Sequence, residues 1–105
     1  ETVAGLAALP AEWFEFVQIC DAPATIPDDR EEMARIIREG RDYLGEGGTD
    51  PAAVLTALPP VVYSMELPNA AHQAALGAEG HARRCLETSR AYLACEGVTD
   101  TEGRR

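Results

Sequence analysis

Two stretches decide the fold: residues 14–23 read FEFVQICDAP, and residues 58–69 read LPPVVYSMELPN. Each contains a run of β-branched and aromatic residues that favour strands, and each run is followed by Pro beside Asp, Ala or Asn, which favours a turn. We therefore predict strands over residues 13–21 and 61–67. The 105 residues include 46% hydrophobic and 26% charged side chains, a composition typical of one small globular domain.

Helices are predicted between and after the two strands. A capping-box spacing that begins at Asp28, followed by an apolar stripe at helical spacing, predicts a helix over residues 28–40. An Asp-Pro pair at the start of residues 50–58 predicts a second, short helix. A third is expected over residues 80–94, and residues 2–9 could be the end of another.

Strands that alternate with helices predict parallel βα units. The segment 43–48 is a candidate for a very short additional strand, which gives about three βα units in all. Three parallel strands leave both edges of a sheet bare, and a complete (β/α)8 barrel needs about 250 residues. We therefore expect either a small open α/β sheet or part of a larger barrel.

The charge and the cysteine content limit which partners and which cellular compartment we expect. The chain has 18 acidic and 9 basic residues, a formal charge of −9, so we expect no nucleic acid and no anionic membrane as a partner. No apolar run reaches the 18 residues of a membrane-spanning helix. The three Cys residues show no C-x-x-C spacing, which favours free thiols and a cytoplasmic protein.

Polar residues lie near the C-terminal end of each predicted strand, where the active sites of parallel α/β folds gather. They are Gln18 and Glu66. Glu66 needs an Arg, a metal ion or solvent as its partner, or it simply marks the point where the strand reaches water. Arg41 precedes a glycine-containing loop and could bind an oxyanion or phosphate, although a tight turn with a solvated Arg explains the same pattern.

Together these stretches resemble a known family. FEFVQICDAP, GRDYLGEG and LPPVVYSMELPN, with the ending HARRCLETSRAYLA, are similar to the C-terminal part of the xylose isomerase-like TIM barrels, the sugar phosphate isomerase/epimerase family. The resemblance spans residues 14–94 and implies the last three βα units of a barrel that is incomplete as a 105-residue chain. It implies a barrel portion over residues 1–98 and a polar tail over 99–105.

The resemblance also implies a site at the mouth of the barrel. Members of the family hold a divalent metal ion there (Mn, Mg, Co or Zn), usually with four ligands. Glu66 matches the last ligand and could also act as a catalytic acid or base, Gln18 stands where a His is common, and Arg41 matches a substrate-binding residue. The first two ligands would come from earlier strands, so the site would be incomplete and the chain inactive alone. The implied partners are a sugar or polyol substrate and the missing N-terminal barrel portion, or copies joined through open sheet edges.

Three functions stay open at this point. The first is an isomerase/epimerase-like enzyme that transfers a proton next to a carbonyl. The second is a lyase like 3-dehydroshikimate dehydratase on the same scaffold, which Gln18 favours. The third is a non-enzymatic acidic α/β interaction module that pairs its bare edges with another protein. Asp21 is expected to be a turn residue, and His72 and His81 are expected to be solvated surface.

Overall fold

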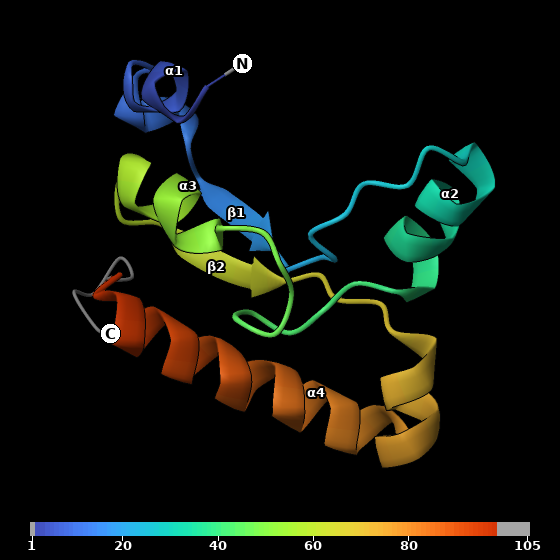
Figure 1. Cartoon of the computed structure of the whole chain (residues 1–105). Helices are drawn as coiled ribbons and strands as arrows, with labels where there is room; N and C mark the ends of the chain where they lie inside the picture. Colours follow the sequence, from blue (N-terminus) through green and yellow to red (C-terminus); the bar gives the residue numbers. More distant parts are fainter. Residues whose placement is uncertain (1, 99–105) are drawn as a thin grey trace.

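A small parallel sheet lies at the centre of the computed structural model, which describes residues 2–98 (Figure 1). Strand β1, Phe16–Ile19, pairs with strand β2, Val62–Met65, so that Phe16 lies opposite Val62 and Ile19 opposite Met65. Both predicted strands are confirmed, but they are shorter than expected. The predicted tail over 99–105 lies outside the described residues.

The prediction of about three βα units is wrong in its count, because the sheet within residues 2–98 has two strands. The candidate strand over 43–48 is instead a turn that follows a single antiparallel bridge between Asp21 and Asp42. A strand at that point would have to separate β1 from β2 or extend one edge. The direct pairing of β1 with β2 rules out the first arrangement, and the turn rules out the second. The class is mixed α/β, and its strands are immediate neighbours.

The described residues form four α-helices and one short 3-10 helix: α1 is Val3–Ala7, η1 is Ala11–Trp13, α2 is Arg30–Glu39, α3 is Pro51–Ala57 and α4 is Ala70–Glu96. The cap of α2 is Asp29 rather than the predicted Asp28, since the Asp29 carboxylate accepts the N–H groups of Glu31 and Glu32. None of the helices in the described part of the chain is both long and apolar enough to cross a membrane.

Helix α4 begins ten residues earlier than the predicted start at residue 80. Asn69 caps it through its side-chain oxygen, which accepts the N–H of His72 at 2.9 Å. The helix is kinked at Gly77, whose φ of 73° lies in the left-handed region that favours glycine. The weak hydrophobic pattern before this kink explains why the sequence did not predict the first part of the helix.

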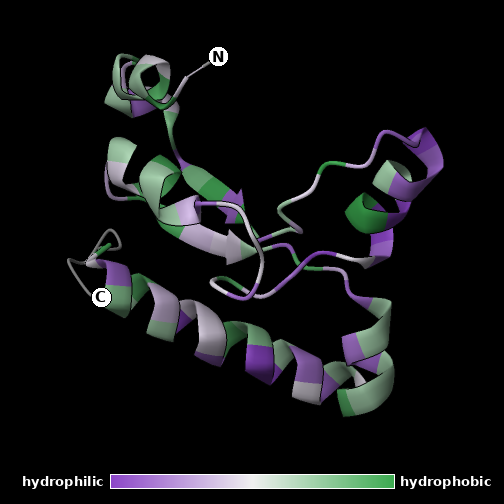
Figure 2. Cartoon of the chain, viewed as in Figure 1, coloured by the Kyte–Doolittle hydropathy of each residue, from purple (hydrophilic) through white to green (hydrophobic). Residues whose placement is uncertain are grey.

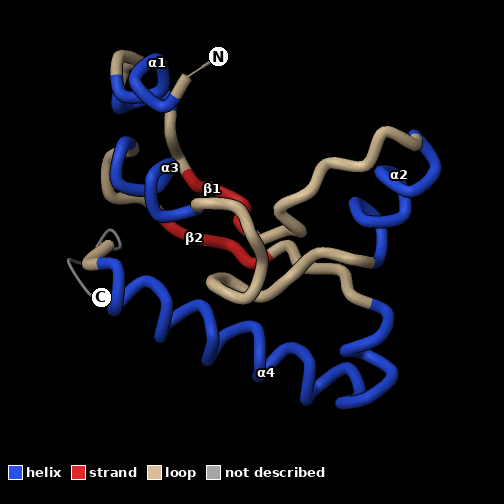
Figure 3. The backbone as a smooth tube through the Cα atoms, viewed as in Figure 1, coloured by secondary structure: helices blue, strands red, loops and turns tan. Residues whose placement is uncertain are grey.

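One face of the sheet is packed and the other is open. Hydrophobic residues dominate β1 and α3, whereas α2 is largely hydrophilic (Figure 2). On the packed face, Ile19 joins a core with Leu55 of α3, and Tyr92 and Leu93 of α4 pack against that core. On the opposite face, Phe16 and Val62 are 59% and 55% exposed. The loops that follow β1 and β2 gather at the C-terminal ends of the strands, where the sequence predicts the site (Figure 3).

Candidate functional site

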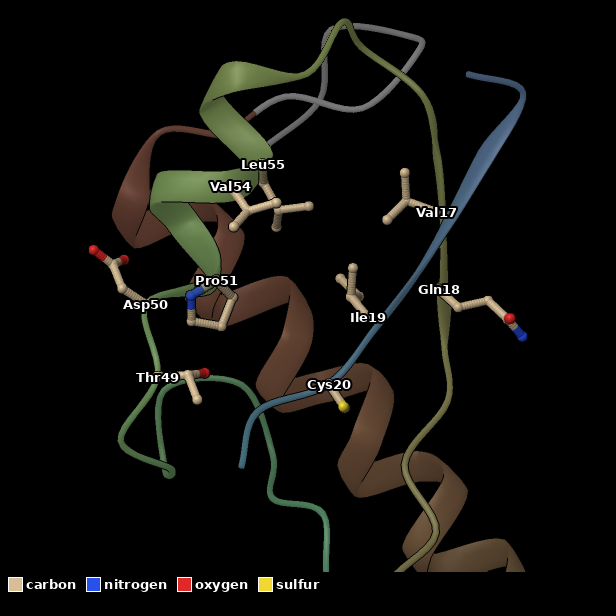
Figure 4. A pocket seen from close by; sticks show the side chains of 9 residues that line it. All are labelled: Val17, Gln18, Ile19, Cys20, Thr49, Asp50, Pro51, Val54 and Leu55. Atoms are coloured by element: carbon tan, nitrogen blue, oxygen red, sulfur yellow. The ribbon is translucent and has the colours of Figure 1, made fainter. Parts of the chain in front are cut away.

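The two predicted metal ligands share the open face of the sheet. Gln18 lies opposite Ser64 in the parallel register. Glu66 lies two residues beyond Ser64, and its N–H donates to the Ile19 carbonyl at 3.1 Å, so the pairing continues to this point. Because side chains alternate between faces along a strand, Gln18, Ser64 and Glu66 point to the same side. Figure 4 shows the Gln18 side chain directed away from Val17 and Ile19 of the packed face.

Arg41 lies beside Glu66, as a shared site requires. Its Nη1 is 3.3 Å from the Glu66 Oε2 atom and 3.3 Å from the Glu66 carbonyl oxygen. Its Nε donates to the Ile37 carbonyl at 2.8 Å, and Asn69 Nδ2 donates to the Arg41 carbonyl at 2.9 Å. Cys20 follows β1 with its Sγ 4.0 Å from Arg41 Nη1. Contacts along both its backbone and its side chain therefore hold this guanidinium at the end of the sheet.

Asp21 holds the loop that follows Arg41 and Asp42, whereas the sequence predicts only a turn residue at this position. Its side chain is almost fully buried, at 1% exposure. Oδ2 accepts the N–H groups of Gly45 and Gly47 at 3.0 and 3.3 Å. Oδ1 accepts the Ala22 N–H at 2.8 Å, and the N–H and hydroxyl of Thr49 at 3.1 and 2.5 Å. The sequence does contain a signal for this contact, because the tight turn GEGGT presents N–H groups that need an acceptor.

The pKa of Asp21 reflects this environment. Burial by itself raises the pKa, but the hydrogen bonds from the side chain of Thr49 and from the backbone N–H groups of Ala22, Thr49 and Gly45 outweigh it, so the pKa lies below its ordinary value. The carboxylate stays ionised at neutral pH, and both its oxygens are occupied by donors. Asp21 is therefore a structural anchor for the loop and is not free to ligate a metal ion.

The two histidines are not the solvated surface groups that the sequence predicts. The Tyr43 hydroxyl, in a side chain 2% exposed, lies 2.8 Å from His81 Nδ1. His81 Nε2 lies 3.0 Å from the Leu67 carbonyl oxygen. A carbonyl only accepts, so in the neutral ring Nε2 carries the proton and Tyr43 donates to Nδ1. The His72 ring stacks on Tyr43 with centroids 4.6 Å apart. These contacts tie α4 to the segments that follow β2 and precede the Gly-rich turn.

The donor chemistry fits a divalent metal ion only in part. An amide oxygen from Gln18 and a carboxylate from Glu66 are hard oxygen ligands of the kind that Mg²⁺ and Mn²⁺ accept. Among residues 2–98, however, no three His, Cys, Asp or Glu side chains lie close enough together to hold a metal ion. Glu66 also faces a cation of the protein's own, Arg41. Two donors with a competing guanidinium favour weak metal binding.

A cleft of about 360 Å³ lies on the packed side of β1 (Figure 4). Its walls come from β1 and α3 and include Val17, Ile19, Val54 and Leu55. The Gln18 backbone contributes to it, but the Gln18 side chain points away. The cleft therefore lies on the opposite side of β1 from the open face with Gln18 and Glu66.

These features define a mixed α/β protein in which two adjacent parallel strands present polar side chains at their C-terminal ends. Comparison of the chain with known protein families, with curated proteins and with solved structures found no match. The similarity to xylose isomerase-like barrels therefore rests on the quoted motifs alone, and what it implies for function is a proposal.

Proposed function

We propose that this chain is the C-terminal part of a divalent-metal-dependent sugar (phosphate) isomerase/epimerase-like barrel and that it contributes two ligands to an incomplete site. One observation carries the proposal. Gln18 and Glu66 share the open face at the C-terminal ends of adjacent parallel strands, and the guanidinium of Arg41 lies 3.3 Å from the Glu66 carboxylate. In closed parallel barrels this face lines the interior, and this end of the strands forms the mouth.

Each of the three side chains has a distinct role in the proposal. Gln18 offers a neutral oxygen ligand, and Glu66 offers a charged one that could also move a proton. Arg41 could orient a hydroxyl, carboxylate or phosphate group of the substrate. The metal ion, when bound, would polarise the substrate oxygens next to the carbon that loses its proton. The remaining ligands and most of the substrate contacts would come from the rest of the barrel.

Two alternatives have observations of their own in their favour. A lyase like 3-dehydroshikimate dehydratase would use the same residues, and the amide at Gln18 favours it. A non-enzymatic interaction module is favoured by the exposure of Phe16 and Val62 on the open face, because exposed apolar side chains that lie together often mark contact surfaces. A sugar, polyol or acid that binds at Arg41 would support an enzyme, whereas a protein that covers the open face would support the module.

Titration of the chain with Mn²⁺, followed by paramagnetic broadening of its NMR signals, tests the proposal. We expect broadening around Gln18 and Glu66, with a dissociation constant of about 1 mM or weaker because the ligand set is incomplete. Glu66→Gln should abolish it. Glu79→Gln is the matched control, since Glu79 also pairs with an arginine, Arg83 at 2.7 Å, but lies on α4.

Two results would count against the proposal. Broadening that is centred away from Gln18 and Glu66, or that survives Glu66→Gln, would remove the metal site. A tight 1:1 metal complex with isomerase activity from this chain alone would show that the site is complete, and it would refute the view of the chain as a portion of a barrel.

A further inference from the structure

One edge of strand β1 has no partner strand in the part of the chain that the structure describes. The Ile19 carbonyl accepts the Glu66 N–H, so the backbone groups of Ile19 face β2. In a parallel ladder the residues of one strand direct their N–H and C=O groups alternately to its two neighbours. The backbone groups of Phe16 and Gln18 therefore face the opposite edge. Because the sheet within residues 2–98 is two-stranded, this edge is open to an added strand.

The cleft of about 360 Å³ borders β1, and its lining residues come from β1, residues 49–51 and α3 rather than from β2. Val17 and Ile19 of β1 form one wall, and Val54 and Leu55 of α3 face them across the space (Figure 4). A cavity of about 150 Å³ accommodates a benzene molecule, so this cleft has room for about two apolar side chains. An extended segment along β1 would direct every second side chain to the α3 side. The edge and the cleft therefore fit the same occupant, a strand with apolar residues at alternate positions.

The charge near the cleft indicates which kind of strand could bind there. The residues that line it include Asp50 but no Arg or Lys, and Glu12 and Glu15 precede β1 in the chain. A second copy of the chain, which would pair its own β1 here, would bring the same acidic residues together. It would also add a second net charge of −9. The charge therefore favours a basic partner over a second copy.

We propose that the open edge of β1 and the cleft that borders β1 bind an extended, basic polypeptide segment. The segment adds to the sheet as a third strand and places two apolar side chains, two residues apart, between β1 and α3. The inference rests on the proposed function in taking this segment to be a strand of the missing barrel portion. The residues of the segment that face away from the cleft would then lie beside Gln18 on the open face, where further metal ligands are required.

A peptide titration without metal tests the inference separately from the metal site. The probe is the acetylated and amidated peptide Lys-Val-Thr-Ile-Thr-Val-Lys, followed by NMR. We expect shifts at the amides of Phe16 and Gln18 and at the methyl groups of Val54, and slower amide exchange at Gln18. The same peptide with Glu in place of both Lys residues should bind at least about tenfold more weakly at low salt, because Asp50 lines the cleft and the chain has a net charge of −9.

Two variants localise the binding. Val54→Arg places a positive charge in the cleft, which opposes a basic peptide, and should abolish binding. Leu86→Arg is its matched control, because Leu86 is a similarly exposed aliphatic residue, 47% against 37%, but lies on α4. Gln18→Pro removes an N–H that faces the open edge while leaving the groups that pair with β2, so it should weaken binding several-fold. Should Val54→Arg fail to fold, Gln18→Pro and the Glu-flanked peptide still test the inference.

Several outcomes would overturn the inference. The first is no shift at millimolar peptide, and the second is shifts that both variants leave unchanged. The third is a dimer in sedimentation experiments that Val54→Arg dissociates, which would make a second copy the occupant. If the chain binds the peptide at this edge but shows no Mn²⁺ broadening around Gln18 and Glu66, the metal proposal is refuted and the peptide-binding inference is retained.

Discussion

Asp21 and Asp42 exchange two backbone hydrogen bonds, each 3.0 Å long, yet the pKa values of their carboxyl groups are shifted in opposite directions. Donors from the turn that follows Asp42 surround the Asp21 carboxylate and lower its pKa in spite of burial. The Asp42 pKa is raised, first by burial and then by the negative charge of Asp21. Ionisation of Asp21 therefore stabilises the folded state, whereas ionisation of Asp42 destabilises it.

Asp21→Asn should destabilise the protein by about 2–4 kcal/mol at pH 7. The substitution removes a buried charge that accepts hydrogen bonds, and it turns an NH₂ group toward N–H donors that then lack an acceptor. Chemical denaturation measures the effect. Retention of full stability would show that the turn does not depend on this carboxylate.

Acid should destabilise the wild type through Asp21. Its pKa is lower in the folded than in the unfolded chain, so its contribution is present above the ordinary Asp pKa of about 3.9 and is lost as pH falls through the folded value. Denaturation at a series of pH values should show the stability of Asp21→Asn falling less steeply than that of the wild type. Parallel curves for the two proteins would contradict the assigned pKa direction.

Asp42→Asn should have the opposite sign and stabilise the protein by about 0.5–1 kcal/mol at pH 7. The folded pKa of Asp42 is raised, so stability from this group is present below the unfolded pKa and is lost as pH rises through the folded one. An uncharged Asn removes the repulsion from Asp21 and keeps the backbone bridge. The comparison with Asp21→Asn is internally controlled, because the two residues are bridge partners. Destabilisation by Asp42→Asn would be inconsistent with the raised pKa.

Gly45→Ala should destabilise more than Gly97→Ala. Both glycines have positive φ angles, 83° and 70°, which cost a non-glycine residue about 1–2 kcal/mol. A Cβ at Gly45 would also lie 2.8 Å from Cδ2 of Tyr92, whereas a Cβ at Gly97 meets nothing within 4 Å. We expect a further loss of about 1–3 kcal/mol at Gly45, since overpacking forces the ring to move. Equal losses in thermal or chemical denaturation would show that Tyr92 moves freely.

Tyr43→Phe should lower the free energy of unfolding by about 1 kcal/mol and remove the hydrogen bond to His81 Nδ1. The variant removes the hydroxyl that donates to Nδ1 and leaves that ring nitrogen without this donor. In the wild type, ¹⁵N chemical shifts of the neutral ring should report the tautomer with the proton on Nε2, because the Leu67 carbonyl accepts from that atom. A proton on Nδ1 would contradict the arrangement. His72→Ala, which removes the stacked ring but not the hydrogen bond, should leave the tautomer unchanged.

Local patterns in the sequence predicted much of the fold for identifiable reasons. The β-branched and aromatic residues predicted β1, in which Val17 and Ile19 lie on the packed face and Gln18 on the open one. The Asp50-Pro51 pair predicted the start of α3, where Asp50 accepts the Ala53 N–H at 3.2 Å. These signals act over a few residues, so they can be read directly from the chain. The cap of α2 was misassigned by one position because two Asp residues stand side by side.

The candidate site was predicted only in part. The sequence placed Gln18 and Glu66 near strand ends and Arg41 before a glycine-containing loop. The structure brings Arg41 to Glu66 and puts Gln18 on the same face as Glu66. The anchoring role of Asp21 was missed because the residue resembles any turn Asp. Except for the adjacent Ala22 N–H, its donors lie 24 to 28 positions further along the chain.

The chain by itself therefore determined the mixed α/β class, the two strands and the polar residues at their ends, since side-chain alternation and helix capping are properties of neighbouring residues. Only the tertiary structure decided that β1 pairs directly with β2, that Asp21 holds the Gly-rich turn and that His81 is tied to Tyr43. Each of these contacts joins segments far apart in sequence, and its stability comes from burial and hydrogen bonds that exist only once the chain has folded.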